Sequence, residues 1–396
     1  MTVLTASLSL FAASGFSVFS LWPDPLGAAV MSLGMVYTFL ALAYRSHRKN
    51  QRRHLAGPGV PDRPVSAGHE DAKGTDMDLK HHHVEVNGLR LHVAEQGEGP
   101  LVLLLHGFPE SWYSWRHQFA PLAEAGYRVV APDQRGYARS DRAANVDEYS
   151  MPYLVGDVVA LIAALGAEDA VVVGHDWGAP VAWTTALLRP DLVRGVVGLS
   201  VPPLPPAGMP SVESSRKIYG DRYYQAYFQE PGRADAELAA DPAATLRRLL
   251  VTASGDGPSP EPVPWVVPEG AGVVDSLPEP PELPAWLTAA DLAVFAEDYS
   301  APDAFTGPLN WYRNIDRNQG LMAAFQGLRI EAPALYVVGD KDMVTALKGV
   351  PELREMLPHI VPKLHADLTL PGCGHWTQQE RPEEVNAALL DFLAAL

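Results

Sequence analysis

The chain has 396 residues, of which 47% are hydrophobic, so it can bury a full core and suits one large domain with an insertion. Its net charge of -17 argues against binding to nucleic acid, which needs a basic surface. The single cysteine, Cys373, excludes an internal disulfide and a multi-cysteine metal site. The composition therefore indicates a globular protein that binds neither DNA nor RNA.

The N-terminal part contains two uncharged, mostly apolar stretches, 3–22 and 26–44, separated by a turn with two prolines. Each is close to the ~20 residues that a helix needs to span a bilayer. The basic run 45–53 follows, and such a flank tends to stay on the cytoplasmic side. Residues 1–56 are therefore predicted to form a membrane hairpin or anchor through residues 1–44, with the catalytic domain on the cytoplasmic side. A single span, a cleaved signal peptide and a soluble helical pair are the alternatives.

Residues 57–83 are polar and show no hydrophobic period, which is typical of a linker. His81, His82 and His83 at its end could indicate a metal site. Adjacent residues that enter a strand point to alternating faces, however, and cannot all meet one ion. We expect these histidines at the surface.

The rest of the chain alternates apolar runs that suit strands with helical patterns, which predicts a mostly parallel sheet with helices on both faces. The predicted strands are 84–86, 89–94, 101–105, 128–131, 171–173, 193–199, 334–338 and 367–370. The predicted helices are 112–125, 151–165, a stretch that ends at Arg189, and 382–396. These elements fall into two blocks, 84–200 and 328–396, which we expect to form one α/β core.

Between these blocks, residues 201–327 show helical pieces and many prolines but no strand rhythm. A long interruption between two sheet strands is best explained as a cap, or lid, over the carboxyl ends of the strands, where ligands bind. Aromatic residues gather in it around Tyr224 and around Tyr312. Most buried tyrosines are packing residues with one satisfied hydroxyl, so the residues alone favour that role for both.

The chain is organised around the stretch from Val171 to Ala179, where a valine strand leads into Gly174-His175-Asp176-Trp177-Gly178. A strand, a sharp turn between two glycines and a helix form the layout of a nucleophile elbow. The exposed residue is Asp176, and a carboxylate attacks carbon without a base to remove a proton. The product is an alkyl ester of the enzyme, so the elbow indicates alkyl transfer followed by hydrolysis.

Two further features fit an elbow enzyme. His375 lies in a glycine loop after the last strand, and Asp342 or Asp340 follows the strand before it, in the chain order nucleophile, acid, histidine. His375 is predicted to activate water that hydrolyses the ester, with the acid orienting its ring. The backbone N–H groups of Phe108 and Trp177 are expected to form the oxyanion hole.

Several motifs together resemble the α/β-hydrolase-fold epoxide hydrolases, from about Val84 to the C-terminus. They are His106-Gly107-Phe108-Pro109-Glu110-Ser111-Trp112, the Gly-His-Asp-Trp-Gly elbow, Tyr-Gln-x-Tyr-Phe-Gln-Glu-Pro-Gly from Tyr224, Gly-Pro-Leu-Asn-Trp-Tyr-Arg-Asn from Gly307, and Gly-His-Trp-Thr from Gly374. Two departures are the hydrophobic N-terminal segment, which is closer to membrane-anchored members than to the mammalian soluble enzyme, and Ala138, where many relatives have a glycine.

The resemblance implies that the protein hydrolyses an apolar epoxide with water to a vicinal diol. It implies that Asp176 opens the oxirane, that His375 activates water, and that Asp342 is the acid. It further implies that Tyr224 and Tyr312 reach from the cap and donate hydrogen bonds to the epoxide oxygen. A phenol has a pKa near 10, so it is protonated at neutral pH and suits this task. No cofactor or metal is implied, and the oligomeric state stays open.

Two other functions compete with this one. A haloalkane dehalogenase shares the aspartate, the histidine and a tryptophan after the nucleophile, but a halide has no use for two phenols. Dehalogenases also usually carry Asn or Trp where Phe108 stands here. A catalytically silent hydrolase-fold binding protein is disfavoured because the triad and both tyrosines are intact, and an esterase because Asp replaces Ser. Epoxide hydrolysis is therefore the function that we expect.

Overall fold

The computed structural model describes residues 79–208, 210–259, 261 and 263–396. The hydrophobic segments and most of the predicted linker lie outside the described residues, so membrane attachment through residues 1–44 stays a prediction. Within the described ranges, no helix combines the length and the apolar character that crossing a membrane requires.

The described part of the chain contains one eight-stranded sheet with the order β1-β2-β4-β3-β5-β6-β7-β8. Strand β2 pairs antiparallel with β1 and β4, and all other neighbours are parallel. The strands are β1 Lys80–Val86, β2 Leu89–Gln96, β3 Leu101–Leu105, β4 Arg128–Pro132, β5 Ala170–His175, β6 Val193–Leu199, β7 Ala334–Gly339 and β8 Leu364–Leu370. The predicted, mostly parallel sheet is confirmed.

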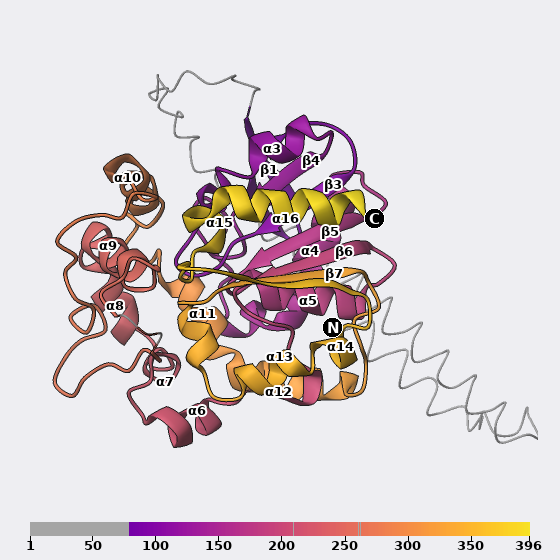
Figure 1. The fold of residues 1–396 in the computed structure, drawn as a ribbon. Helices are drawn as coiled ribbons and strands as arrows, with labels where there is room; N and C mark the ends of the chain where they lie inside the picture. The colour runs from indigo at the N-terminus through magenta and orange to yellow at the C-terminus, as the bar shows by residue number, and fades with distance from the viewer. Residues whose placement is uncertain (1–78, 209, 260, 262) are drawn as a thin grey trace, which may run out of the picture. The chain divides into compact units, whose positions relative to one another are not determined.

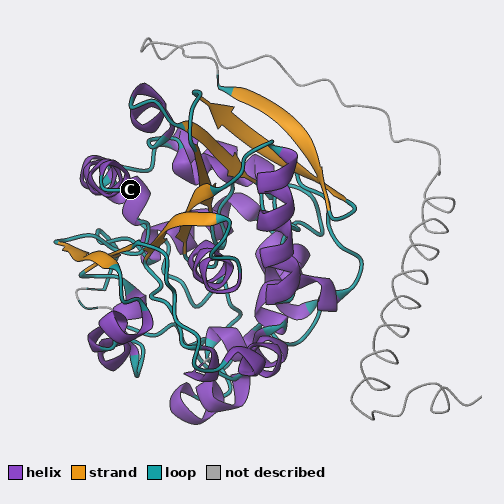
Figure 2. Ribbon diagram, turned by 90° about the vertical axis from the view of Figure 1, so that its right-hand side faces the viewer, coloured by secondary structure: helices purple, strands orange, loops and turns teal. Residues whose placement is uncertain are grey.

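Helices cover both faces of this sheet (Figures 1 and 2). Residues of α3, Phe119–Glu124, and α16, Pro382–Ala394, belong to one apolar cluster with Val171 and Val173 of β5. Residues of α4, Met151–Ala164, and α5, Gly178–Leu188, belong to the other cluster, with Val172. Because side chains alternate along a strand, each central strand is buried on both faces, which is why these strands are continuous apolar runs.

The predicted helix 112–125 is wrong as a single element. The chain forms a 3₁₀ helix, η2, over Trp112–Trp115 and then the separate helix α3. Pro121 lies within the first turn of α3, where its missing N–H is harmless. In a continuous helix its ring would clash with the carbonyl of residue 117, so the helix has to restart.

Two strands, β1 and β8, begin well before their predicted first residues. Strand β1 begins at Lys80, so the three histidines that were placed in the linker are strand residues, and all three are exposed, as expected. Strand β8 begins at Leu364, and its side chains alternate between intermediate burial and exposure almost to its end. It lies at the edge of the sheet, where one face is only partly covered, so its sequence lacks the apolar run that marks the central strands.

The segment between β6 and β7, residues 201–327, contains helices and long irregular stretches, and we call it the cap segment. In Figure 1, helices α6 to α10 lie to the left of the sheet. Its helices are α6 Val212–Tyr219, α7 Tyr224–Tyr227, α8 Arg233–Ala239, α9 Pro242–Thr252, α10 Ala289–Asp298, α11 Thr306–Arg313 and α12 Ile315–Met322, with 3₁₀ turns η4 Pro206–Gly208 and η5 Ala323–Phe325.

The remaining short helices lie in the core block. They are the 3₁₀ turns η3 Val146–Tyr149 and η6 Met343–Ala346, and the helices α13 Val350–Glu355, α14 Leu357–Ile360 and α15 Thr377–Glu380. Of these, η6 and α15 matter most for function, because η6 directly follows Asp342 and α15 follows His375.

Candidate active site

Asp176 occupies the sharp turn between strand β5 and helix α5. Its φ of 48° lies in the left-handed region, which residues other than glycine rarely adopt. The flanking glycines allow the backbone to pass closely: a Cβ on Gly174 would come within 2.1 Å of the Gly178 carbonyl oxygen, and a Cβ on Gly178 within 2.1 Å of the Leu105 carbonyl oxygen. The turn therefore tolerates no side chain at either glycine, and it holds Asp176 at the carboxyl edge of the sheet.

Asp176, His375 and Asp342 form a connected line of side chains. His375 Nε2 lies 3.3 Å from Asp176 Oδ2, and His375 Nδ1 lies 2.9 Å from Asp342 Oδ1. The sequence left Asp340 open as the acid, but its Oδ1 instead accepts the backbone N–H of Gly372 at 2.8 Å. The strand ends thus bring together three residues that are far apart in the sequence, and the partner of the histidine is Asp342.

Burial and charge act in opposite directions on these groups. Burial by itself would lower the pKa of His375, but the charge of Asp342 and the hydrogen bond with Asp176 raise this pKa well above its ordinary value. Burial would raise the pKa of both aspartates, yet their interactions with His375 hold the pKa of each below its ordinary value. The resting site therefore favours an imidazolium between two carboxylates.

The second oxygen of Asp176 faces the backbone of the loop after β3. Its Oδ1 accepts the N–H of Phe108 at 2.7 Å, and Trp177, the other predicted oxyanion donor, directly precedes helix α5. His106 holds this loop: its Nε2 accepts the N–H of Gln134 at 3.0 Å, and its Nδ1 lies 3.0 Å from the Gly107 carbonyl oxygen. Both ring nitrogens of His106 are thereby engaged, so the ring braces this loop.

Tyr224 and Tyr312 come from separate helices, α7 and α11, and their ring centroids lie 5.8 Å apart. Burial raises the pKa of both hydroxyls, and the charge of Asp176 raises each pKa further. Both hydroxyls therefore stay protonated at neutral pH. The geometry brings these tyrosines together with Asp176, because all three line the same cavity.

One glutamine fixes the distance between the two tyrosine helices. Gln229 Nε2 donates to the carbonyl oxygen of Tyr312 at 2.9 Å and to that of Gln225 at 2.8 Å. Arg313 adds a second link, since its Nε donates to the Phe228 carbonyl oxygen at 3.2 Å. The spacing of the tyrosines is therefore set by side chains that bind backbone carbonyl groups in and next to α7 and α11.

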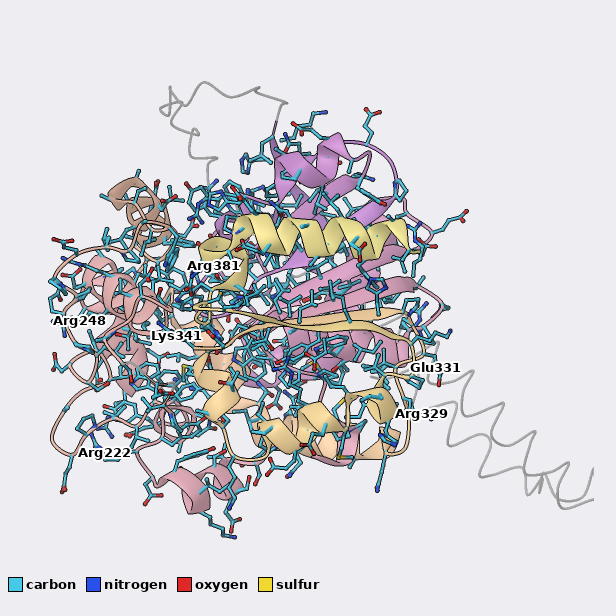
Figure 3. The ribbon with its side chains drawn as sticks, in the orientation of Figure 1. Arg222, Arg248, Arg329, Glu331, Lys341 and Arg381 are labelled. Atoms are coloured by element: carbon cyan, nitrogen blue, oxygen red, sulfur yellow. The ribbon has the colours of Figure 1, made fainter. Side chains whose placement is uncertain are left out.

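The shared cavity has a volume of about 260 Å³, and its walls are mainly apolar. They include Leu249, Trp265, Leu277, Met343, Val344 and Trp376. The Trp265 ring stacks on Tyr224 with centroids 5.3 Å apart. Lys341, labelled in Figure 3, is a cation at the wall, and its Nζ donates to the Gly255 carbonyl oxygen at 2.9 Å. The cavity thus presents the carboxylate and the two phenols to a largely apolar ligand.

Comparison with known proteins places this site in a family. A family model described as the alpha/beta hydrolase fold matches residues 100–251. Epoxide hydrolase A of Mycobacterium tuberculosis is 45% identical over 316 residues, which cover 79% of this chain and 97% of that protein. Epoxide hydrolase 3 of Siraitia grosvenorii is 39% identical, with 80% of this chain and 98% of that protein covered. The chain belongs to the epoxide hydrolases.

A solved structure agrees with this membership. Epoxide hydrolase A from Mycobacterium thermoresistibile superimposes with a TM-score of 0.74 and 46% identity, covering 81% of this chain and 99% of that one. The epoxide hydrolase described here is thus an enzyme of the α/β-hydrolase fold that acts on an epoxide and water. The expected fold class and reaction are confirmed, and the alternative interpretation as a haloalkane dehalogenase is set aside.

The described part of this epoxide hydrolase has no group of three or more His, Cys, Asp or Glu side chains arranged to hold a metal ion. Asp176, His375 and the two tyrosines line one cavity, so a carboxylate, an imidazole and two phenols face the same space.

Sequence reasoning missed two groups that contact the epoxide hydrolase triad. Ser200 follows strand β6 and lies against both Asp342 and His375. His175 Nε2 donates to the His375 carbonyl oxygen at 2.7 Å, while His175 Nδ1 lies 2.8 Å from Glu110 Oε2. The rule that functional residues follow parallel strands would have pointed to Ser200. No local signal marks the pairing of His175 with Glu110.

Proposed function

We propose that this epoxide hydrolase works through a covalent ester on Asp176. The observation that carries the proposal is the convergence of Asp176, His375, Tyr224 and Tyr312 on one cavity with mainly apolar walls. Attack by a carboxylate on an epoxide carbon breaks the carbon–oxygen bond and leaves an alkoxide, which needs a proton donor. Both phenols are protonated and face the same space, so they supply that donation.

The two oxygens of Asp176 have different surroundings, which suggests different tasks. Oδ1 accepts the Phe108 N–H, so it becomes the ester carbonyl oxygen and carries the negative charge when water attacks. The Trp177 N–H, at the start of α5, is the second donor of this oxyanion hole. Oδ2, on the side of His375, is the oxygen that attacks the epoxide.

His375 then acts as the base of the second step, with Asp342 orienting its ring. The carboxylate of Asp176 raises the pKa of His375 in the resting enzyme, after the larger effects of burial and of Asp342. Ester formation removes the negative charge of Asp176, so the pKa of His375 falls when a base is needed. The proton that His375 gives up restores the phenol that protonated the alkoxide. The neutral imidazole then takes a proton from water as the water oxygen attacks the Asp176 carbonyl carbon. The ester carbon–oxygen bond breaks, the leaving alkoxide takes that proton from His375, and the diol departs.

The isotope distribution of a single turnover tests this mechanism. The full-length enzyme would react once with a styrene-type epoxide in oxygen-18 water, and mass analysis would follow the diol and the Asp176 peptide. We expect label in Asp176 and unlabelled oxygen in the diol, because water attacks the ester carbonyl carbon. Label in the diol with none in Asp176 would mean that water attacks the epoxide directly, and it would overturn the proposal.

The choice of acid has a matched pair of variants. Asp342→Asn removes the carboxylate that lies beside His375 Nδ1, so we expect slow hydrolysis of the ester while ester formation continues. Asp340→Asn changes an acid that binds the Gly372 N–H instead, and we expect turnover close to that of the unmodified enzyme. The reverse result would assign the role to Asp340.

The cap and the membrane segment are part of the same proposal. Residues 201–327 act as the lid that carries both tyrosines, and the apolar walls of the cavity select an apolar epoxide. Residues 1–44 attach the enzyme to a membrane, on the strength of two apolar stretches and a basic flank in the sequence. Extraction of membranes at alkaline pH tests attachment: full-length protein should stay in the pellet, whereas protein that starts at Lys80 should be released.

A further inference from the structure

Ser200 is the residue outside the expected triad that contacts two of its members. It is fully buried at the end of strand β6. Its Oγ donates to Asp342 Oδ2 and lies 2.8 Å from His375 Nδ1. The other oxygen of Asp342, Oδ1, faces His375 Nδ1 and accepts the N–H of Val344 at 2.9 Å. Ser200 therefore holds the carboxylate oxygen that the histidine leaves free.

The backbone of Ser200 has a conformation that disfavours a side chain. Its φ is 74°, in the left-handed region, which glycine adopts without steric cost and which strains other residues. Two contacts with strand β7 keep it there: the Ser200 N–H donates to the Val337 carbonyl oxygen at 2.8 Å, and the Tyr336 hydroxyl donates to the Ser200 carbonyl oxygen at 2.9 Å. Glycine would relieve this strain, yet the chain carries a hydroxyl that reaches Asp342 and His375.

We infer that Ser200 is a positioning residue of the epoxide hydrolase reaction, which holds the Asp342 carboxylate in the orientation that aligns His375 for activating water. A carboxylate can rotate about its Cβ–Cγ bond, and a donor on Oδ2 fixes that rotation so that Oδ1 stays opposite Nδ1. The inference rests on the proposed roles of Asp176, His375 and Asp342. Ser200 is inferred to assist hydrolysis of the ester and to play no part in formation of the ester.

Two variants separate the hydroxyl from the strain. Ser200→Ala removes the hydroxyl and keeps a strained side chain, whereas Ser200→Gly removes the hydroxyl and relieves the strain. Ser114→Ala is the matched control, because Ser114 is also fully buried but its Oγ has no hydrogen-bond partner among the described residues. If the hydroxyl is what matters, Ser200→Ala and Ser200→Gly behave alike in catalysis and differ only in thermal stability.

The measurement is a stopped-flow and rapid-quench reaction of the full-length enzyme with a styrene-type epoxide, read by tryptophan fluorescence and by mass of the ester peptide. We expect ester formation at the rate of the unmodified enzyme and hydrolysis slower by about 10- to 100-fold in both Ser200 variants, the effect of losing a hydrogen bond to a charged group. Ser114→Ala should leave both steps unchanged.

The pH dependence of the hydrolysis rate distinguishes a positioning residue from a merely structural one. Loss of a structural contact would leave this pH dependence unchanged. The titratable groups near His375 include Asp342, Asp176 and His175, and the His175 ring centroid lies 5.0 Å from that of His375. Once the ester has formed, Asp176 is neutral. Without the Ser200 donor, Asp342 keeps more negative charge beside His375 and stabilises the imidazolium. His375 then becomes a neutral base only at higher pH, so the acid limb of the hydrolysis rate should move to higher pH in both variants.

Three results are decisive. Hydrolysis by Ser200→Gly at the rate and pH dependence of the unmodified enzyme would overturn the inference. Equal slowing of ester formation and hydrolysis, with an unmoved acid limb, would also overturn it, because that is the result of a general disturbance. The failure of the proposed function looks different, since the unmodified enzyme would then accumulate no ester at all.

Discussion

The sheet and the cap segment contribute to the cavity in different ways. Asp176, Asp342 and His375 each follow a strand of the sheet, and neighbouring strands place them within hydrogen-bond distance. Tyr224 and Tyr312 lie on two short helices whose relative position depends on Gln229 and Arg313. Backbone pairing therefore positions Asp176 and His375, whereas side-chain contacts position Tyr224 and Tyr312. We expect changes at the strand ends to act on ester formation, on ester hydrolysis or on stability, and changes in the cap to act on ring opening.

The largest effect is expected for Asp176→Asn. An amide is a poor nucleophile, so steady-state turnover of a styrene-type epoxide should fall by about 10⁴-fold or more. The melting temperature should change little, because the amide still fits the turn and its oxygen still accepts the Phe108 N–H. Turnover within tenfold of that of the unmodified enzyme would show that another residue attacks the epoxide.

The next effect concerns the cap. In the double variant Tyr224→Phe with Tyr312→Phe, the departing alkoxide has no phenol donor, and ester formation should slow by about 10³-fold, within the range of general acid catalysis. Tyr137→Phe is the control, since Tyr137 is fully buried, its hydroxyl has no partner among the described residues, and it does not line the cavity. Full activity of the double variant in a single-turnover assay would show that the two tyrosines do not supply the proton to the alkoxide.

A pair of glycine substitutions sharpens the contrast between the two regions. Gly178→Ala would place a Cβ against the Leu105 carbonyl oxygen, and we expect the free energy of unfolding to fall by about 3 kcal/mol, as overpacking does. Gly320→Ala, in helix α12 of the cap segment, meets open space, so it should be neutral or stabilise by about 0.5–1 kcal/mol. Urea denaturation of both variants measures the difference; equal stabilities would contradict the geometry of the turn.

The smallest effect is a shift in the titration of His375. Asp176→Asn removes one of the carboxylates that raise the pKa of His375, and it imitates the neutral ester. We expect this pKa to fall, because the neutral amide no longer stabilises the imidazolium as the carboxylate does. The imidazole would then be neutral, and able to act as a base, at a lower pH. An NMR titration of the labelled ring against pH provides the value, and a rise of the pKa would contradict the proposed coupling.

The sequence by itself determined the sheet and the elbow. Continuous valine and leucine runs mark strands buried on both faces, and strands β3 and β6 have the predicted bounds. Two glycines around Asp176 indicate a turn that only small residues permit, and the structure shows the backbone contacts that require them. These features depend on the spacing of residues along the chain, so they can be predicted from the sequence. The exceptions are also local: Pro121 splits a predicted helix, and the edge strand β8 lacks an apolar run.

Only the tertiary structure decided which groups meet in the cavity. Asp340 and Asp342 have similar positions after strand β7, and the direction of the loop brings Asp342 to His375 while Asp340 turns to Gly372. Nothing near Ser200 in the sequence shows that its hydroxyl reaches residues far along the chain, because the left-handed turn that aims it is imposed by contacts with β7. Side chains from distant segments become neighbours through packing, and the spacing of residues within one segment does not predict that packing.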